Sequence, residues 1–86
     1  MTDREDESEL PPIQRFRISA VVEQSGPSFV AKVFVVPAHG PRPVEPAVIS
    51  TCKFRKQAQR EQAMLVIAVG AGIRARGGVV EGVELE

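Results

Sequence analysis

The sequence predicts an α+β fold in which an antiparallel three-stranded sheet carries one C-terminal helix on one face, in the order β-β-β-α. Residues 16–22 and 29–36 alternate apolar and polar side chains, as half-buried strands do. Residues 55–76 instead place apolar side chains at helical spacing. A chain of 86 residues, 43% of them hydrophobic, has material for one small core. We therefore expect a single domain over residues 13–78.

The first two strands are predicted on either side of a turn at residues 24–28. Gly26 is free to take a positive φ and Pro27 cannot donate to a strand ladder, so this pair separates the strands. The inward-facing residues of the first strand are Phe16, Ile18, Ala20 and Val22. In the second strand Lys32 marks the solvent face, which places Phe34 outside. The inward-facing residues are then Phe29, Ala31, Val33 and Val35.

A proline-rich loop and a third strand follow. Four prolines fall within residues 37–46, and they are incompatible with a helix or a central strand. The third strand is predicted from Val48 to Phe54. Its inward-facing residues are Val48, Ser50, Cys52 and Phe54.

One long helix is predicted to begin at Arg55 or Lys56 and to end between Ile73 and Arg76, because Gly77-Gly78 provides a stop. A buried strand at residues 64–69 is the alternative. The residues expected to lie on the sheet are Ala58, Leu65, Val69 and Ile73.

Three apolar residues, Met64, Ile67 and Ala71, point well away from that face of the helix. The outer side of a surface helix in a monomer is normally polar. We therefore expect these three residues to be covered, either by the residues that follow the helix or by a second copy of the chain in a homodimer.

The charges are unevenly distributed along a chain whose net charge is zero. Residues 1–12 hold five carboxylates and one Arg and end in two prolines, so we expect a disordered acidic arm. Residues 79–86 hold three Glu and are expected to form a flexible tail. Residues 13–78 hold ten Lys and Arg and three Glu, a net charge of 10 − 3 = +7. This distribution favours an anionic partner, or it serves solubility alone.

Nothing in the sequence indicates secretion or membrane insertion. The longest uncharged apolar run covers residues 63–73, well short of the ~20 residues that a membrane-spanning helix needs. The acidic N-terminus lacks the basic and then apolar layout of a secretion signal. Cys52 is the only cysteine, so no internal disulfide can form. We expect a cytoplasmic protein without a membrane partner.

The residue types argue against an enzyme. Residues 13–78 contain one His, one Cys, three Glu and no Asp, without a carboxylate pair or a cluster at metal-ligand spacing. His39 lies in the proline-rich loop while Cys52 is expected to face the core, which disfavours a Cys–His nucleophile. Residues 66–75 match the GxGxxA spacing of a dinucleotide site, but those glycines must open a helix, and too few residues follow for it. We expect no catalysis, no metal and no small-molecule cofactor.

The start of the predicted helix is unusually basic. A helix N-terminus carries partial positive charge, so cations there cost ~0.3–1 kcal/mol each. No Ser, Thr, Asp or Asn stands at residues 53–55 to cap it. Exposed cations beside free backbone N–H groups are suited to phosphate. The alternative is a solvated polar face neutralised by Glu61 or by the acidic arm. The cations concerned are Lys53, Arg55, Lys56 and Arg60.

Two resemblances follow. Residues 24–36 and 53–63 resemble the later part of a double-stranded-RNA-binding domain, without that family's first helix. The family has a Gly-Pro turn between its first two strands and a Lys-Lys-x-Ala-Lys start to its last helix. Arg55, Lys56 and Ala58 match the start of that motif, which implies phosphate contacts across the RNA major groove. Residues 13–76 also resemble small, mostly uncharacterised proteobacterial proteins with three strands and one helix, which implies no activity.

We therefore expect a non-enzymatic module that binds duplex RNA or another polyanion. Its predicted site is the basic helix start, with Arg17 and Lys32 on the open face of the sheet as extensions. The alternative is a protein-interaction or structural module, a homodimer formed through the apolar outer side of the helix.

Overall fold

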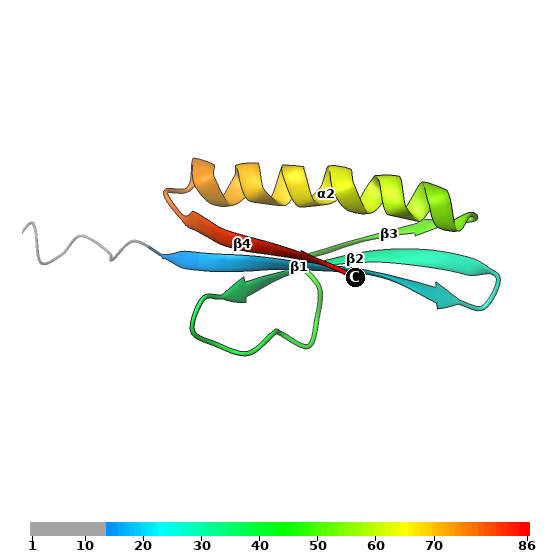
Figure 1. The fold of residues 1–86 in the computed structure, drawn as a ribbon, viewed down its shortest axis with the longest axis horizontal. Helices are drawn as coiled ribbons and strands as arrows, with labels where there is room; N and C mark the ends of the chain where they lie inside the picture. The colour runs from blue at the N-terminus through cyan, green and yellow to red at the C-terminus, as the bar shows by residue number, and fades with distance from the viewer. Residues whose placement is uncertain (1–13) are drawn as a thin grey trace, which may run out of the picture.

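A long hairpin forms the centre of the structure (Figure 1). The computed structural model describes residues 14–86, so the acidic arm predicted at residues 1–12 lies outside them. Strands β1 (Arg15–Ser25) and β2 (Ser28–Pro37) pair antiparallel, from Phe16 opposite Pro37 to Ser25 opposite Ser28. Gly26 opens the connecting turn with a φ of +59°, a conformation that side chains with a Cβ rarely adopt.

Two shorter strands complete the sheet, whose order is β3-β2-β1-β4. Strand β3 (Val48–Cys52) pairs antiparallel with β2, and β4 (Val79–Leu85) pairs parallel with β1. The predicted α+β class is confirmed. The predicted sheet was wrong in detail, because residues 79–85, expected in a flexible tail, form a fourth strand and make the sheet mixed.

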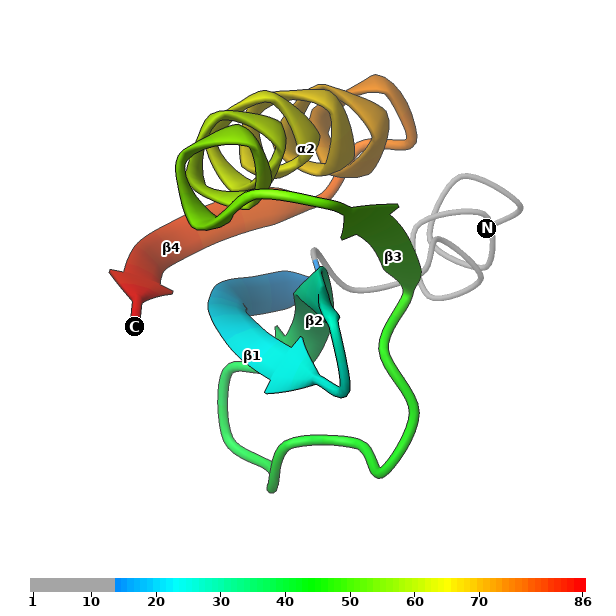
Figure 2. The same cartoon turned by 90° about the vertical axis from the view of Figure 1, so that its right-hand side faces the viewer.

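The helix α2 (Arg55–Ala75) covers one face of the sheet, as Figure 2 shows. The predicted bounds are confirmed, and the alternative of a strand at residues 64–69 is wrong. Ile18 and Val33 of the sheet are fully buried beneath the helix. The helix residues predicted to face the sheet do so, since Ala58 is buried and the other three pack on this core, namely Leu65, Val69 and Ile73.

A tight corner joins α2 to β4. The N–H of Gly77 donates to the carbonyl of Arg74 at 3.0 Å, and the N–H of Gly78 donates to that of Ile73 at 2.9 Å. Gly77 has a φ of +86°, and a Cβ on Gly78 would lie 2.7 Å from Cγ2 of Ile73. The predicted glycine stop is therefore confirmed, and it also turns the chain back to run alongside β1.

The other face of the sheet has a small apolar cluster of its own, formed by Val21, Phe34 and Val36. The proline-rich loop of residues 38–47 lies over this face, opposite α2 (Figures 1 and 2). The guanidinium carbon of Arg42 stands 4.5 Å from the centre of the Phe34 ring. Phe34 was correctly placed on this face, but it is only 5% exposed because the loop covers it.

Phe54 does not extend the third strand. β3 ends at Cys52, which is buried as expected, and two residues then bend the chain towards α2. The prediction that Phe54 faces the core was wrong, since its side chain is 68% exposed.

Candidate anion-binding site at the start of α2

The first turn of α2 has no capping side chain. Phe54 occupies the N-cap position with extended backbone, φ −126° and ψ 144°, and makes no side-chain hydrogen bond to the turn. Its carbonyl accepts the N–H of Ala58 at 3.0 Å, which leaves the three intervening N–H groups without a helical partner. The first turn contains no acidic residue either. This end of the helix therefore keeps its partial positive charge.

The four predicted cations gather around this end of the helix. Lys53 precedes the N-cap, Arg55 and Lys56 belong to the first turn, and Arg60 follows in the second. All four side chains are exposed, and none has a carboxylate within 4 Å among residues 14–86. The structure thus brings these four together, and none of them forms an ion pair with an acid in the described part of the chain.

Glu61 is engaged elsewhere, although the sequence offered it as the neutralising residue. Its Oε1 accepts a hydrogen bond from the Ser50 hydroxyl at 3.1 Å, which ties α2 to β3. No ion pair from Glu61 to a cation is present in residues 14–86.

A ring on β2 supports Arg55. The guanidinium carbon of Arg55 lies 5.0 Å from the centre of the Phe29 ring, within the range of a cation–π contact. The alternation of β2 predicted that Phe29 faces the helix side. It could not predict contact with Arg55, because that depends on where α2 crosses the sheet.

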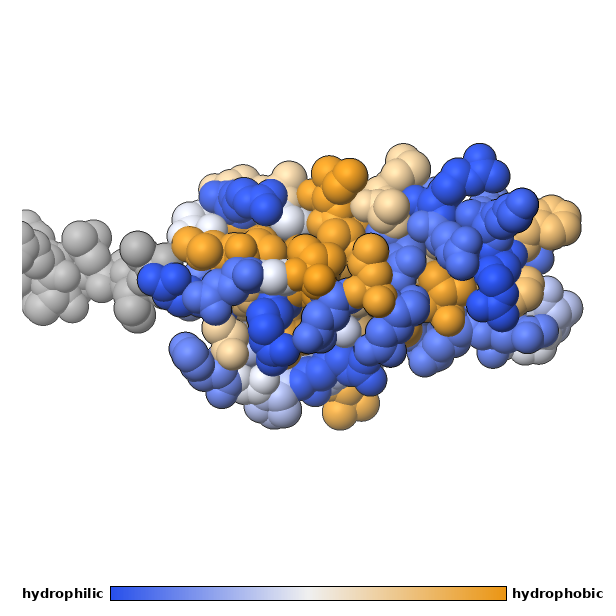
Figure 3. Space-filling model, in the orientation of Figure 1, coloured by the Kyte–Doolittle hydropathy of each residue, from blue (hydrophilic) through white to orange (hydrophobic). Residues whose placement is uncertain are grey.

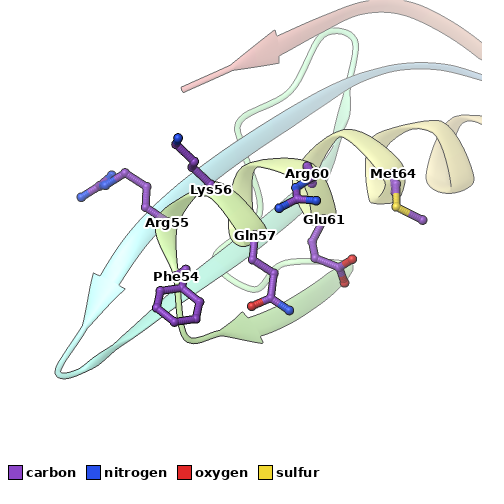
Figure 4. Close-up of a pocket in the computed structure, with 7 residues that line it drawn as sticks. All are labelled: Phe54, Arg55, Lys56, Gln57, Arg60, Glu61 and Met64. Carbon is purple, nitrogen blue, oxygen red and sulfur yellow. The ribbon is translucent and has the colours of Figure 1, made fainter.

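Three of the four cations, Arg55, Lys56 and Arg60, border a shallow groove of about 790 Å³. Arg55 and Lys56 extend from the helix start in different directions, and Met64 lies at the far end (Figure 4). Arg55 and Arg60 are five residues apart, or ~7.5 Å along the helix axis. Charged groups that diverge over this length suit an extended chain of phosphates better than one small anion. The groove is lined by Phe54, Arg55, Lys56, Gln57, Arg60, Glu61 and Met64.

Arg17 and Lys32, the predicted extensions, lie on the opposite face of the sheet. Lys32 Nζ is 2.8 Å from Glu23 Oε1, and Arg17 Nη1 is 3.9 Å from Glu84 Oε2. Arg17 also donates to the carbonyl of Gly40 in the proline-rich loop, at 3.4 Å. Both cations already have carboxylate partners, and α2 lies on the other side of the sheet. They do not belong to the site at the helix start.

The remaining candidates have other surroundings. Cys52 is buried and His39 is exposed in the proline-rich loop. The GxGxxA stretch lies inside α2, so its glycines do not open a helix.

Residues 14–86 hold no group of three or more His, Cys, Asp or Glu able to bind a metal ion. No helix within these residues is both long and apolar enough to cross a membrane.

Comparison with known proteins identifies no relative: no family model, no curated protein and no solved structure matches this chain significantly.

Proposed function

We propose that this chain is a non-enzymatic module that binds an extended polyanion, with duplex RNA as the expected ligand, through Lys53, Arg55, Lys56 and Arg60. One observation carries the proposal. These four cations gather at one uncapped helix end and lack an ion-pair partner in residues 14–86, while Arg15, Arg17 and Lys32 on the far face of the sheet each have one. The other cations of these residues lie apart from this end, Arg42 in the proline-rich loop and Arg74 and Arg76 at the opposite end of α2.

Local helix stability does not explain this choice of residues. Cations at a helix N-terminus oppose the helix dipole, and the turn has no cap to offset them. Phosphate oxygens would accept the free N–H groups and also neutralise the cations. The resemblance of residues 53–63 to the last helix of a double-stranded-RNA-binding domain supports RNA over other polyanions.

The test is a fluorescence anisotropy titration of the parent chain with a generic labelled duplex RNA, repeated between about 50 and 200 mM salt. Phosphate contacts release counterions, so four contacts predict a plot of log K against log salt with a slope of about −3 to −4. Undetectable binding at the lowest salt, or a slope near zero, contradicts the proposal. If duplex DNA of the same sequence binds as tightly as the RNA, the chain binds polyanions through this site without a preference for RNA.

The predicted interaction module meets the proposed site at one residue. Met64 lines the far end of the groove, whereas Ile67 and Ala71 are exposed on α2 beyond it. The two predictions are therefore compatible except at Met64.

A further inference from the structure

One aromatic side chain is exposed at the basic start of α2. The end of the molecule at which α2 begins is mostly hydrophilic on the side seen in Figure 3. Phe54 at this end is 68% exposed, whereas Phe34 is buried and both Phe16 and Phe29 are partly buried. Phe54 also holds the N-cap position, where a phenylalanine cannot cap the helix with its side chain. Its ring therefore serves neither the core nor the helix end.

The side chains beside the Phe54 ring suit a nucleic-acid base better than a phosphate. Figure 4 shows Phe54 and Gln57 on one side of the helix start, while Arg55 and Lys56 extend in other directions. The Gln57 amide is exposed and makes no side-chain hydrogen bond within the described part of the chain, so it can both donate and accept at a base edge. Glu61 lines the same groove, and a carboxylate repels phosphate but accepts hydrogen bonds from the amino group of a base.

The groove thus combines two kinds of contact. Its cations attract phosphates, whether or not the attached bases are paired. An aromatic ring contributes only where a base face is free, and the bases of a duplex are stacked on one another. Unpaired bases in loops, bulges and ends do stack on aromatic side chains. The groove extends from Phe54 to Met64, ten residues or ~15 Å along the helix axis, so a base fits beside the bound phosphates.

We infer that Phe54 stacks on an unpaired base of the bound nucleic acid, so that this site prefers a duplex with a single-stranded end to a blunt duplex. The inference rests on the proposed polyanion site, whose cations hold the strand beside the ring. It adds a contact that depends on the bases rather than on charge. Gln57 contacts the edge of the stacked base.

The test compares three labelled RNA duplexes with the same paired sequence, by fluorescence anisotropy of the full chain at about 50 mM salt. The first duplex is blunt, the second has a short 3′ overhang of adenosines, and the third has an abasic overhang of the same length. The last two carry the same phosphates and differ only in the overhanging bases. The parent chain should bind the adenosine overhang about fivefold or more tightly than the abasic overhang.

Two variants assign this preference to the ring. Phe54→Leu keeps an apolar side chain without a ring, so it should bind the adenosine and abasic overhangs equally. Its salt slope should match that of the parent, because no charge is removed. Phe54→Trp is the matched control, which retains an aromatic face and should retain the preference. Circular dichroism melts check that both variants are folded, as the exposure of Phe54 predicts.

Three results overturn the inference and leave the polyanion site intact. The parent binds all three duplexes equally, Phe54→Leu retains the preference for the adenosine overhang, or Phe54→Trp loses it as completely as Phe54→Leu. The first comparison needs no variant, so it holds even if a substitution disturbs the helix start. Failure of the parent to bind any of the three duplexes overturns the polyanion site, and this inference with it.

Discussion

Seven of the ten Lys and Arg in residues 14–86 lie in two regions with opposite electrostatic surroundings. On the far face of the sheet, Arg15 and Arg17 meet Glu81 and Glu84 of β4, and Lys32 meets Glu23 of β1. At the start of α2, four cations crowd a helix end that already carries positive charge, and the described residues offer them no carboxylate. The first set joins neighbouring strands, so its charge serves the fold. The second set opposes the helix dipole and has no ion pair in the described residues, which is why we propose it as the polyanion site.

The largest effect expected from this difference is on binding. Replacing Lys53, Arg55 and Lys56 with Gln removes about three counterion-release contributions, so affinity for duplex RNA should fall by about 10²–10³-fold at ~50 mM salt, and the salt slope should decrease by about three. Replacing Arg15, Arg17 and Lys32 with Gln changes the net charge equally. That control should weaken binding less than about tenfold, because those side chains lie on the opposite face. Equal losses in the two triple variants contradict the assignment of the site to the helix start.

The far-face triple should instead lose stability. Exposed ion pairs contribute ~0.2–1 kcal/mol each, so the free energy of unfolding should drop by about 1–2 kcal/mol in total. Urea titrations measure the loss, and it should shrink in ~1 M salt, where exposed charges are screened within ~3 Å. A loss that persists undiminished in high salt shows that packing of the long side chains, rather than their charge, stabilises the sheet.

A smaller loss of RNA affinity is expected when the Phe29 ring beside Arg55 is removed. Phe29→Leu removes the ring beside Arg55 and with it a contact of ~0.5–1 kcal/mol, so RNA affinity should decrease by about two- to fivefold. The matched control is Arg42→Gln, which removes the other arginine–ring contact, at Phe34, from the far face. Anisotropy titrations of the two variants should separate them. Unchanged affinity for Phe29→Leu shows that the ring does not orient Arg55 for binding.

The smallest expected effect is a change in melting temperature, and its sign distinguishes a free cationic helix start from one clamped within the molecule. The helix-start triple should unfold at a slightly higher temperature than the parent, because each removed cation relieves a few tenths of a kcal/mol of repulsion from the helix dipole. A lower melting temperature indicates instead that the cations are clamped within the molecule. Deletion of residues 1–10 should then cause a similar loss, since those residues carry the carboxylates that could clamp them.

The elements that the sequence predicted are those whose residues contact neighbours near in the chain. Alternation identified Ile18 and Ala20 as buried in β1, and helical spacing placed Leu65 and Val69 on the sheet. The Gly26-Pro27 turn joins β1 and β2 directly, so local preferences and final structure agree.

What the sequence did not reveal depends on contacts between distant segments. β4 pairs with β1 from the other end of the described chain, and a bulge between Phe16 and Arg17 in that pairing interrupts the register. The glycines and glutamates of residues 77–86 favour an irregular tail when considered alone. Phe34 is buried only because a distant loop folds over it, and Phe29 meets Arg55 only because α2 begins above β2. At the candidate site, composition identified the four helix-start cations. The alternation of the strands placed Arg17 and Lys32 on the open face, but it could not show that they form ion pairs with Glu84 and Glu23.

The parallel pairing of β1 with β4 has a consequence for the order in which the molecule assembles. Hairpins close within microseconds, whereas contacts between remote segments must first overcome the entropy of closing a long loop. Until residues 79–85 arrive, one edge of β1 stays open, and the buried Gln62 lacks the carbonyl of Glu86, to which its side chain donates at 3.2 Å. Edge strands held by such remote contacts tend to open first, so β4 is where amide hydrogen exchange should begin.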